Sequence, residues 1–408
     1  MKKLEVGIVI LLLLVAEPLS LPRFVENIVS IISYAFLFFV FIRQWKKSIY
    51  FATTDISLLL FVTFAVASVF WSANPSNTAY QARLMLRVTL LGVYLGMQYT
   101  PREQIRLLCW TSGISMILSV ATSLLFPSHG TQFINGSVAW TGIYTHKQIL
   151  GRQMGFAASL FMINIFDRRS NRWIAIIGLS LAFAILLFSK SKTGLILLIF
   201  SLAILPIYKI IKQRSDRFLF LLIILFIVTI FAFLVIVNFE FIVVDFLGKD
   251  IELNGRLPIW ELAIEKGYEQ PWLGYGYRGF WTSEASDSIL YNTWAALLEE
   301  FATREIAFHA HNGLIDMFLE LGLIGLFLFL LNFFYMSQRI IILLLSSRAI
   351  EYLWMLSFIG ICFLTNITES QIILSSTNTF WIVYVSVAIS SAFDFRQMKN
   401  NLYLKTSL

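Results

Sequence analysis

Two histidines stand close together ahead of a long apolar stretch near residue 310. His309 and His311 are two of the four histidines in the chain and lie in the stretch FHAHNGLIDMFLELG. Histidine is well suited to accept a proton near neutral pH, because its ordinary pKa is about 6.5. Asn312, Asp316 and Glu320 follow at four-residue intervals and would share one side of a helix. Such a polar stripe should face the interior of a helix bundle or a wet cavity.

The sequence leaves three interpretations of this histidine pair open. In the first, His311 is a general base that removes a proton from a hydroxyl group. In the second, the His-x-His pair binds a metal, although two ligands are too few and the sequence offers no evident third. In the third, both imidazoles only form hydrogen bonds at a membrane surface. We predict no metal site and no cofactor.

Basic side chains mark two further places in the chain. Lys190 and Lys192 interrupt an otherwise apolar run, LLFSKSKTGLILLIF, with too few polar residues for a loop. They predict a tight turn at the membrane surface, where lysines either serve function or only reach toward the lipid headgroups. His146, Lys147 and Arg152 bracket the start of another apolar segment. We expect both groups on the same membrane face.

An arginine accompanies a predicted helix start in NGRLPIWELAIEKG, residues 254–267. Asn254 is a good helix cap and Pro258 suits the first turn, so Arg256 would stand at the helix N-terminus. Backbone N–H groups and a guanidinium at one place favour an anion such as phosphate. The alternative is an arginine that simply lies at the protein surface.

The connection that contains this helix, residues 239–311, is rich in acidic and aromatic residues. It holds twelve of the twenty-four Asp and Glu residues of the chain. Acids mixed with flat rings suit hydroxylated ligands such as sugars, and the aromatic content argues against disorder. Tyr275 and Tyr277, in the glycine-spaced turn PWLGYGYRGF, are the rings that we expect at the substrate. The alternative is a cap whose rings lie at headgroup level.

The elements that must position these residues are membrane helices. The chain has 408 residues, of which 58% are hydrophobic and 13% charged, whereas soluble domains carry about 25% charged residues. Apolar runs of ~20 residues recur along the chain, and continuous runs of this kind form helices in lipid. The predicted spans lie near residues 5–22, 25–42, 55–72, 84–99, 105–126, 148–166, 173–189, 193–208, 217–238, 312–336, 351–365 and 373–393.

The predicted fold is therefore all-α, a polytopic membrane helical bundle of about twelve transmembrane helices with one large extracytoplasmic loop. Residues 1–238 would hold helices one to nine, 239–311 the loop with short helices, and 312–408 the last three helices and a cytoplasmic tail. We interpret the first apolar run as a retained helix, because no clear small-x-small cleavage site follows it. Lysine and arginine concentrate in alternate connections, which places both termini in the cytoplasm.

The net charge of +7 follows from this topology signal, so we expect membrane lipids and no nucleic acid as partners. The extracytoplasmic face would then hold cations beside a candidate base, which predicts a lipid diphosphate carrying a sugar. Arg256 and Lys192 would hold the diphosphate, whose charge must be stabilised as it leaves, while His311 would accept the proton of an acceptor hydroxyl. The other side chains that we expect to contact substrate are His309, Asn312, His146, Lys147, Arg152, Lys190, Tyr275 and Tyr277.

Four stretches together resemble the O-antigen ligase / O-antigen polymerase superfamily. They are THKQILGR (145–152), SKSKTGL (189–195), GRLPIWELA…PWLGYGYRGFW (255–281) and HAHNGLIDMFLELGLIGL (309–326). The resemblance covers roughly residues 140–330, and the first four spans match only in hydropathy. The superfamily includes lipopolysaccharide ligases, exopolysaccharide polymerases and bacterial protein O-oligosaccharyltransferases.

The resemblance implies a metal-independent, inverting transfer of a glycan from an undecaprenyl-diphosphate carrier, at the periplasmic face of a bacterial inner membrane. The acceptor would be lipid A–core or a carrier-linked glycan. His311 matches the proposed base of the family, and Arg256 matches an arginine that binds the diphosphate. Lys192 stands where the family often has a second arginine, and lysine lacks the bidentate guanidinium fork.

Two choices remain open from the sequence. A ligase and a polymerase differ only in the acceptor, and GYGYRGFW leans toward a polymerase by its likeness to exopolysaccharide enzymes. A transporter or flippase of anionic lipid-linked glycans would use the same cations without chemistry. It would need charged residues in both membrane halves, whereas the charges embedded in the predicted spans lie mostly toward one face.

Overall fold

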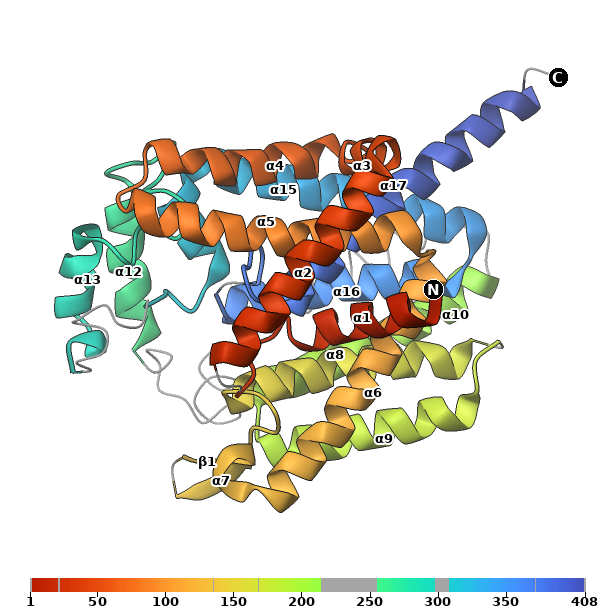
Figure 1. Ribbon diagram of the computed structural model, residues 1–408, viewed down its shortest axis with the longest axis horizontal. Helices are drawn as coiled ribbons and strands as arrows, with labels where there is room; N and C mark the ends of the chain where they lie inside the picture. Colours follow the sequence, from red (N-terminus) through yellow and green to blue (C-terminus); the bar gives the residue numbers. More distant parts are fainter. Residues whose placement is uncertain are drawn as a thin grey trace.

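The computed structural model of the chain is almost entirely α-helical (Figure 1). The one sheet among the described residues is an antiparallel hairpin of β1 (Thr131–Ile134) and β2 (Ser137–Trp140). The prediction of an all-α membrane bundle is therefore confirmed. The structure describes residues 2–20, 23–134, 136–167, 169–213, 255–297, 308–370 and 372–406. The predicted ninth span, 217–238, lies outside them.

Most long helices run roughly along one axis (Figure 1). The long helices are α1 (Lys2–Leu14), α2 (Arg23–Arg43), α4 (Ile56–Ala67), α5 (Pro75–Gln98), α6 (Pro101–Leu125), α8 (Lys147–Phe166), α9 (Arg172–Ser189), α10 (Lys192–Gln213), α15 (Gly313–Ser347), α16 (Ile350–Thr368) and α17 (Thr379–Thr406). The short ones are α3 (Trp45–Ala52), α7 (Pro127–Gly130), α12 (Arg256–Gly267), α13 (Asp287–Tyr291) and the 3₁₀ turns at Ser68–Phe70, Glu284–Ser286 and Trp294–Leu297. We call the end of the bundle that carries α12, on the left in Figure 1, the α12 end.

Five helices of the described part are long and apolar enough to cross a membrane: α6, α8, α9, α15 and α16. A sixth span is counted if α2 and α3, which are bent by 102° at their junction, form one span. Every predicted span among the described residues falls at least partly on a helix. The total of twelve stays a prediction, because several of these helices are short or carry charges.

Helix starts follow the capping residues of the sequence. The α5 start uses Asn74, whose side chain accepts a hydrogen bond from the N–H of Asn77, and proline follows the cap. At the α6 start, Thr100 and Glu103 form a reciprocal capping box. Both arrangements satisfy N–H groups that have no partner inside the helix. These two helices therefore begin where the chain supplies a cap, and the connections before them are short.

Helix α17 forms the centre of the bundle. Its first half is fully buried, with the large rings of Trp381 and Tyr384 inside the core. It packs tightly on α5, because Gly92 has no side chain where a Cβ would lie only 2.6 Å from the carbonyl oxygen of Ile382. The predicted last span, 373–393, is wrong at its beginning: the helix starts at Thr379, and the residues before it are irregular.

Helix α15 is broken near its start, although the sequence predicted a continuous span there. Gly322 has φ 63° and ψ −167°, which is not a helical conformation. The turn of residues 271–275 fills the break: the N–H of Leu323 donates to the carbonyl of Pro271 at 2.7 Å, and the N–H of Tyr275 donates to that of Leu319 at 2.8 Å. Backbone groups that a break frees inside a membrane need such partners.

Irregular chain also occupies the α12 end beside these helices. Helix α1 ends at Leu14, whereas the predicted span continued to residue 22, and Leu19 forms a β-bridge with Tyr144. We call residues 369–378 the α16–α17 segment, and its described residues, 369–370 and 372–378, are largely buried between the helices. Irregular backbone is tolerated at membrane depth only where protein covers it or a cavity adjoins it. This segment is therefore part of the core of the α12 end.

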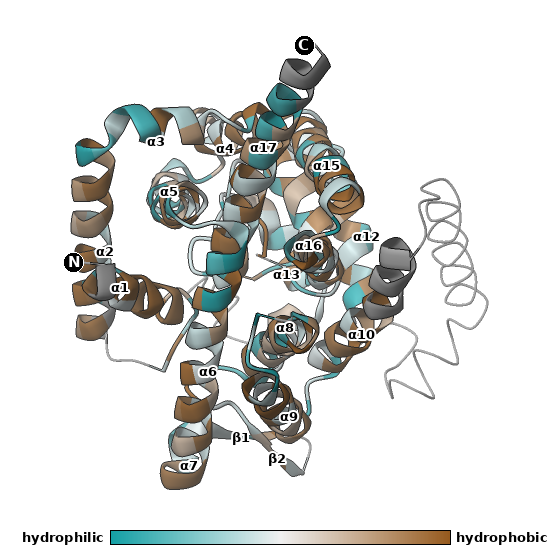
Figure 2. Ribbon diagram, turned by 90° about the vertical axis from the view of Figure 1, so that its right-hand side faces the viewer, coloured by the Kyte–Doolittle hydropathy of each residue, from teal (hydrophilic) through white to brown (hydrophobic). Residues whose placement is uncertain are grey.

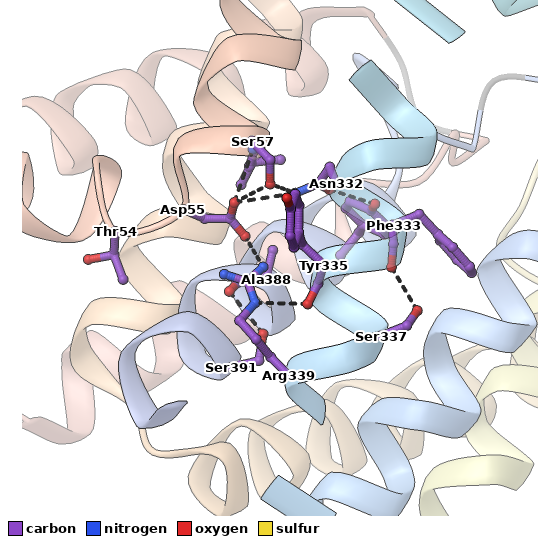
Figure 3. A network of polar contacts seen from close by, with 12 residues as sticks. Thr54, Asp55, Ser57, Asn332, Phe333, Tyr335, Ser337, Arg339, Ala388 and Ser391 are labelled. Atoms are coloured by element: carbon purple, nitrogen blue, oxygen red, sulfur yellow. Dashed lines mark hydrogen bonds and ion pairs between the residues drawn. The ribbon is translucent and has the colours of Figure 1, made fainter. Parts of the chain in front are cut away.

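A buried ion pair joins α4 to α15 at the opposite end of the bundle (Figure 3). Asp55 caps α4 through the N–H of Leu58 and pairs with Arg339 of α15. Asn332 donates to the hydroxyl of Ser57 at 3.0 Å, and it accepts from the hydroxyl of Tyr384 at 2.7 Å. Because the ion pair and both hydrogen bonds of Asn332 join different helices, this network ties α4, α15 and α17 together.

Candidate functional site

The histidine pair lies in the turn just before α15. The Nδ1 atom of His309 accepts a hydrogen bond from the backbone N–H of His311 at 3.2 Å, and the two ring centres are 4.0 Å apart. The neutral ring of His309 then carries its proton on Nε2. His311 has φ 54°, a left-handed conformation that is uncommon for a residue with a side chain. Such strain often accompanies a functional position.

Neighbouring polar residues hold this turn in place. Asn312 caps α15, because its side-chain oxygen accepts from the N–H groups of Leu314 and Ile315. Asp316 is buried and accepts from the indole N–H of Trp281 at 2.7 Å and from the N–H of Ala310 at 3.1 Å. The polar stripe predicted on this helix thus faces protein, and its first members shape the histidine turn.

Arg256 is the first residue of α12, as the sequence predicted, although the cap is Gly255. Asn254, the predicted cap, lies outside the described residues. The guanidinium donates to the carbonyl of Thr368, at the end of α16, at 3.0 Å. Trp294 connects the two parts of the site: a Cβ on Gly255 would lie 2.8 Å from its ring, and its ring centre is 6.4 Å from that of His311.

Glu369, the first residue of the α16–α17 segment, is the acidic group that the basic side chains share. Burial lowers the pKa of Arg256, while the charge of Glu369 raises it. Burial likewise lowers the pKa of His309, and the charges of Asp316 and Glu369 oppose this change. For His146, burial lowers the pKa and Glu369 again opposes it. One carboxylate therefore lies within electrostatic reach of α12, the α15 turn and the start of α8.

The lysine turn packs against the start of α8. His146 caps α8 through Nδ1, which accepts from the N–H of Gln148 at 3.2 Å. The side chain of Gln148 accepts from the hydroxyl of Ser191 at 3.1 Å. Lys190 is exposed in the left-handed conformation that ends α9, and Lys192 is exposed as the first residue of α10. The turn between two apolar helices is as the sequence predicted, and it lies beside His146.

Three residues predicted to contact substrate are held in the protein interior. The guanidinium of Arg152 pairs with buried Glu17 at 3.1 Å and lies 5.5 Å from the ring centre of Phe380. The hydroxyl of Tyr275, which is 5% exposed, donates to Glu269 at 3.1 Å. Tyr277, which is 1% exposed, packs in the core. Their partners keep these three side chains in the interior, and their contact with substrate stays a prediction.

Burial also changes how the two tyrosines titrate. It raises the pKa of Tyr277 to about 12, and its hydroxyl donates to the carbonyl of Leu374 in the α16–α17 segment. Burial likewise raises the pKa of Tyr275, and its hydrogen bond to Glu269 adds to the increase. Both hydroxyls therefore stay protonated near neutral pH and act as donors that fix the glycine-spaced turn.

Sequence reasoning missed two charged residues. Arg278, in a left-handed conformation, lines a small cavity with Asp316 and Glu320. Burial lowers its pKa, but Tyr277, Glu320 and Asp316 together raise it above the ordinary value. Glu369 was missed because one acid between two apolar segments has no distinctive pattern. The available signal for Arg278 was its place in GYGYRGFW, where it is the one charged residue among rings and glycines.

The site thus combines a histidine turn, an arginine at a helix start and a surface lysine turn. Arg256, His309 and His146 share the electrostatic influence of Glu369. Lys192 follows Ser191, whose hydroxyl donates to Gln148 at the start of α8. Lys147 follows His146 on α8. Among the residues that the structure describes, no three His, Cys, Asp or Glu side chains form a group that could hold a metal ion. Cations beside imidazoles suit an anionic substrate and a proton transfer.

Part of this site lies in a range of the chain that matches a known protein family. Residues 154–330 match the model of the O-antigen ligase family. The matched range includes Lys192, Arg256 and His311. His146, Lys147 and the helix start at α8 precede the matched range. The predicted resemblance to the O-antigen ligase and polymerase superfamily is confirmed.

A curated relative points the same way. The chain is 26% identical over 292 residues to the exopolysaccharide production protein ExoQ of Rhizobium meliloti (strain 1021). The alignment covers 66% of this chain and 62% of the relative, so the chain spans about three fifths of that protein's length. With its apolar helices, the chain is an O-antigen ligase-like multi-pass protein of a bacterial inner membrane.

Proposed function

We propose that the protein transfers a glycan from an undecaprenyl-diphosphate carrier to a hydroxyl acceptor. One observation carries the proposal: the histidine turn and Arg256 lie within electrostatic reach of the same carboxylate, Glu369. The histidine turn and Arg256 both fall in the range that matches the O-antigen ligase family. A lipid diphosphate is an anion at a membrane surface, and it must leave with its charge stabilised. An acceptor hydroxyl must lose a proton, and an imidazole can take it.

The α12 end faces the periplasm in this proposal, and both termini are cytoplasmic. Support comes from the opposite end of the bundle, where basic residues gather at the helix ends. Cytoplasmic connections of membrane proteins carry an excess of lysine and arginine. The basic residues described there include Arg43, Lys46, Lys47, Arg102, Arg106, Arg172 and Arg348.

The reaction is a single displacement at the anomeric carbon of the first sugar. The acceptor hydroxyl attacks that carbon as His311 takes its proton, and a new glycosidic C–O bond forms. The bond between the anomeric carbon and the phosphate oxygen breaks, and its electron pair leaves with the lipid diphosphate. Attack opposite to the leaving group inverts the configuration. His311 returns its proton to water, so the balance needs no metal and no cofactor.

Arg256 has two features that suit the leaving group. It stands where α12 presents free N–H groups, so helix and guanidinium attract the same anion. Its partner in the structure is a neutral carbonyl oxygen of Thr368, which a phosphate oxygen could replace as acceptor. Lys192 supplies a second positive charge from the α10 start, as a point charge without the guanidinium fork. His146, Lys147 and Lys190 would contact the same lipid headgroup region.

His309 positions His311 in this mechanism. Its Nδ1 accepts from the N–H of His311, which supports the left-handed backbone there. Asn312 begins α15 directly after the turn and fixes where the helix axis starts. The backbone that carries the imidazole of His311 is thus fixed by hydrogen bonds on both sides of it. Preorganised groups of this kind contribute because they need no rearrangement in the transition state.

The name of the relative favours a polymerase over a ligase. ExoQ is described as an exopolysaccharide production protein, and a polymerase would transfer the growing glycan to another carrier-linked repeat. A ligase would transfer it to lipid A–core. The substrate partners proposed are therefore a carrier-linked donor and a carrier-linked acceptor.

The test uses purified protein in liposomes with a labelled undecaprenyl-diphosphate glycan. Carrier-linked repeats and lipid A–core are supplied in separate reactions. We expect a ladder of products on the carrier, and His311→Ala should lower its rate by about a hundredfold or more, the usual contribution of a general base. His129→Ala is the matched control, because His129 is exposed on α7 and outside the site.

Three outcomes would change the proposal. A single shift of lipid A–core in place of a ladder would make the protein a ligase. A His311→Ala variant that transfers at the wild-type rate would remove His311 as the base. If no reaction depends on His311 and labelled glycan merely crosses the bilayer, the transport alternative replaces the transferase.

A further inference from the structure

A second cavity lies between α1, α2, α5 and the start of α17. Its volume is about 290 Å³. Figure 2, which looks along the bundle, shows α1 and α2 at one edge with α5 next to them. None of the candidate catalytic residues lines this cavity. Apolar side chains form much of its wall, among them Leu12, Val15, Leu84, Val88 and Leu91.

A positive charge from the middle of a helix lines this mixed polar and apolar cavity. Arg87 is the thirteenth residue of the 24 in α5 and lines the cavity. Its guanidinium donates to the hydroxyl of Ser30 on α2 at 2.6 Å and lies 5.4 Å from the ring centre of Tyr34. Both partners are neutral. Arg87 lies in the predicted span 84–99, and an arginine in a membrane helix is costly and usually pairs with an opposite charge.

The described side chains around the cavity offer Arg87 no opposite charge. Glu17 lines the same cavity, but its Oε2 pairs with Arg152 at 3.1 Å. Its Oε1 accepts from the backbone N–H of Thr379 at 2.7 Å. No ion pair of the described residues includes Arg87. A ligand that brings a negative charge would supply what these side chains do not.

The position of the cavity selects the class of ligand. Ser30 is in the first half of α2, and Glu17 and Thr377 are at the α12 end, so the cavity lies in the membrane half that carries the site. An arginine side chain on α5 also leans toward the start of its own helix, which is at that end. A phosphate fits the guanidinium fork, and the apolar wall fits the upper part of acyl chains. A volume near 300 Å³ holds a headgroup and not a whole lipid.

We propose that the cavity between α1, α2 and α5 binds the phosphate group of an anionic membrane lipid through Arg87. The lipid tails would extend between α2 and α5 into the bilayer. The site is separate from the glycan-transfer site, so lipid binding there does not depend on the proposed reaction. The α16–α17 segment adjoins both, because Thr377 lines this cavity and Glu369 faces the histidines.

The test measures lipid retention and needs no glycan substrate. Delipidated protein in detergent is incubated with phosphatidylglycerol or with diacylglycerol of the same chains, and bound lipid is counted by native mass spectrometry. We expect the wild type to prefer phosphatidylglycerol by about tenfold or more, because hydrogen bonds to charged groups are strong. Arg87→Gln should remove this preference. Arg83→Gln should keep it, because Arg83 is exposed on the same helix and does not line the cavity.

Additional variants and competing ligands identify the lipid and control for misfolding. Arg87→Lys keeps the charge and should bind more weakly than the wild type but better than Arg87→Gln, which provides a comparison if the glutamine variant folds poorly. Displacement of phosphatidylglycerol by undecaprenyl diphosphate, dependent on Arg87, would assign the cavity to the carrier lipid. Equal retention by Arg87→Gln and wild type would overturn the proposal. Displacement by inorganic phosphate alone would overturn it too, since the ligand would then be a free anion.

Discussion

At the scale of single residues, one carboxylate influences most of the basic groups of the site. Glu369 opposes the effect of burial on Arg256, His146 and His309. It comes from the α16–α17 segment, whereas the basic groups come from three other parts of the chain. A fixed negative charge beside a site for diphosphate also repels that ligand. In the proposed function, Glu369 therefore both offsets the charge of the basic groups and weakens the affinity of the site for the diphosphate product.

This double role predicts the effect of Glu369→Gln. The variant should be inhibited by undecaprenyl diphosphate about three- to tenfold more strongly, because a like charge is removed near the bound product. The measurement is product inhibition of glycan transfer in liposomes. Glu351→Gln, at the start of α16 and the opposite end of the bundle, is the control. Weaker inhibition of Glu369→Gln would mean that this residue acts mainly by positioning Arg256.

The buried histidines predict how stability depends on pH. The folded-state pKa values of His309 and His146 lie below the ordinary 6.5, mainly because of burial. Below about pH 6.5 the unfolded chain therefore binds protons that the folded chain does not. The free energy of unfolding should be highest above this pH and should fall as the pH decreases further.

Thermal unfolding in detergent checks this sign. The midpoint should drop between about pH 7.5 and about pH 5.5, and His309→Gln should make the drop smaller. His129→Gln, at an exposed position, should leave it unchanged. An identical drop in the wild type and in a variant that replaces both buried histidines would assign the pH dependence to other groups.

At the scale of elements, the break in α15 depends on one glycine. Gly322 has a positive φ, and a Cβ there would lie 2.3 Å from the carbonyl oxygen of Trp272. Gly322→Ala should lower the free energy of unfolding by about 2 kcal/mol or more, from backbone strain and this clash together. The measurement is the unfolding midpoint in detergent.

The same helix connects this strain to activity. The turn of residues 271–275 is held in the break, and the histidine turn is at the α15 start, so Gly322→Ala should also lower glycan transfer. Gly7→Ala is the control, because a Cβ on Gly7 meets nothing within 4 Å and alanine favours a helix. A Gly322→Ala protein as stable as the Gly7→Ala protein would contradict this account of the break.

Sequence patterns predicted the elements better than their interruptions. Long apolar runs located the membrane helices, and cap signals located Arg256 and the histidines at helix starts. The break at Gly322 escaped because a single glycine also occurs in continuous helices. Arg152 was expected to contact substrate because it lies near His146 and Lys147 in the sequence. Its ion-pair partner, Glu17, is 135 residues away and gives no local signal. The burial of Tyr275 and Tyr277 likewise could not be predicted from the composition of the connection.

At the scale of the whole molecule, the Asp55–Arg339 pair joins an early helix to a late one. Asp55 is 2% exposed, and its carboxylate also accepts from Ser57 and Leu58. Removing one partner leaves the other charge buried, which costs about 3–5 kcal/mol. Asp55→Asn should therefore lower the unfolding midpoint strongly, although this end of the bundle is remote from the histidines.

A double variant tests whether charge is the cause. Asp55→Leu combined with Arg339→Met removes both charges and should recover much of the stability lost in Asp55→Asn. The measurement is thermal unfolding of the three proteins in one detergent. If the double variant is as unstable as the sum of its single variants, the loss comes from packing and capping at α4 and not from an unpaired charge.

The α16–α17 segment also has a consequence for biosynthesis. Thr368 follows Arg256 by 112 residues, and Glu369 comes next. At about 5–20 residues per second, a ribosome makes Arg256 roughly 6 to 20 seconds before these partners. Until then the arginine at α12 lacks both its carbonyl acceptor and its carboxylate. A nascent chain inserted that far holds most of the candidate site residues without their arrangement, so in the proposed function transfer begins only after the α16–α17 segment has been made.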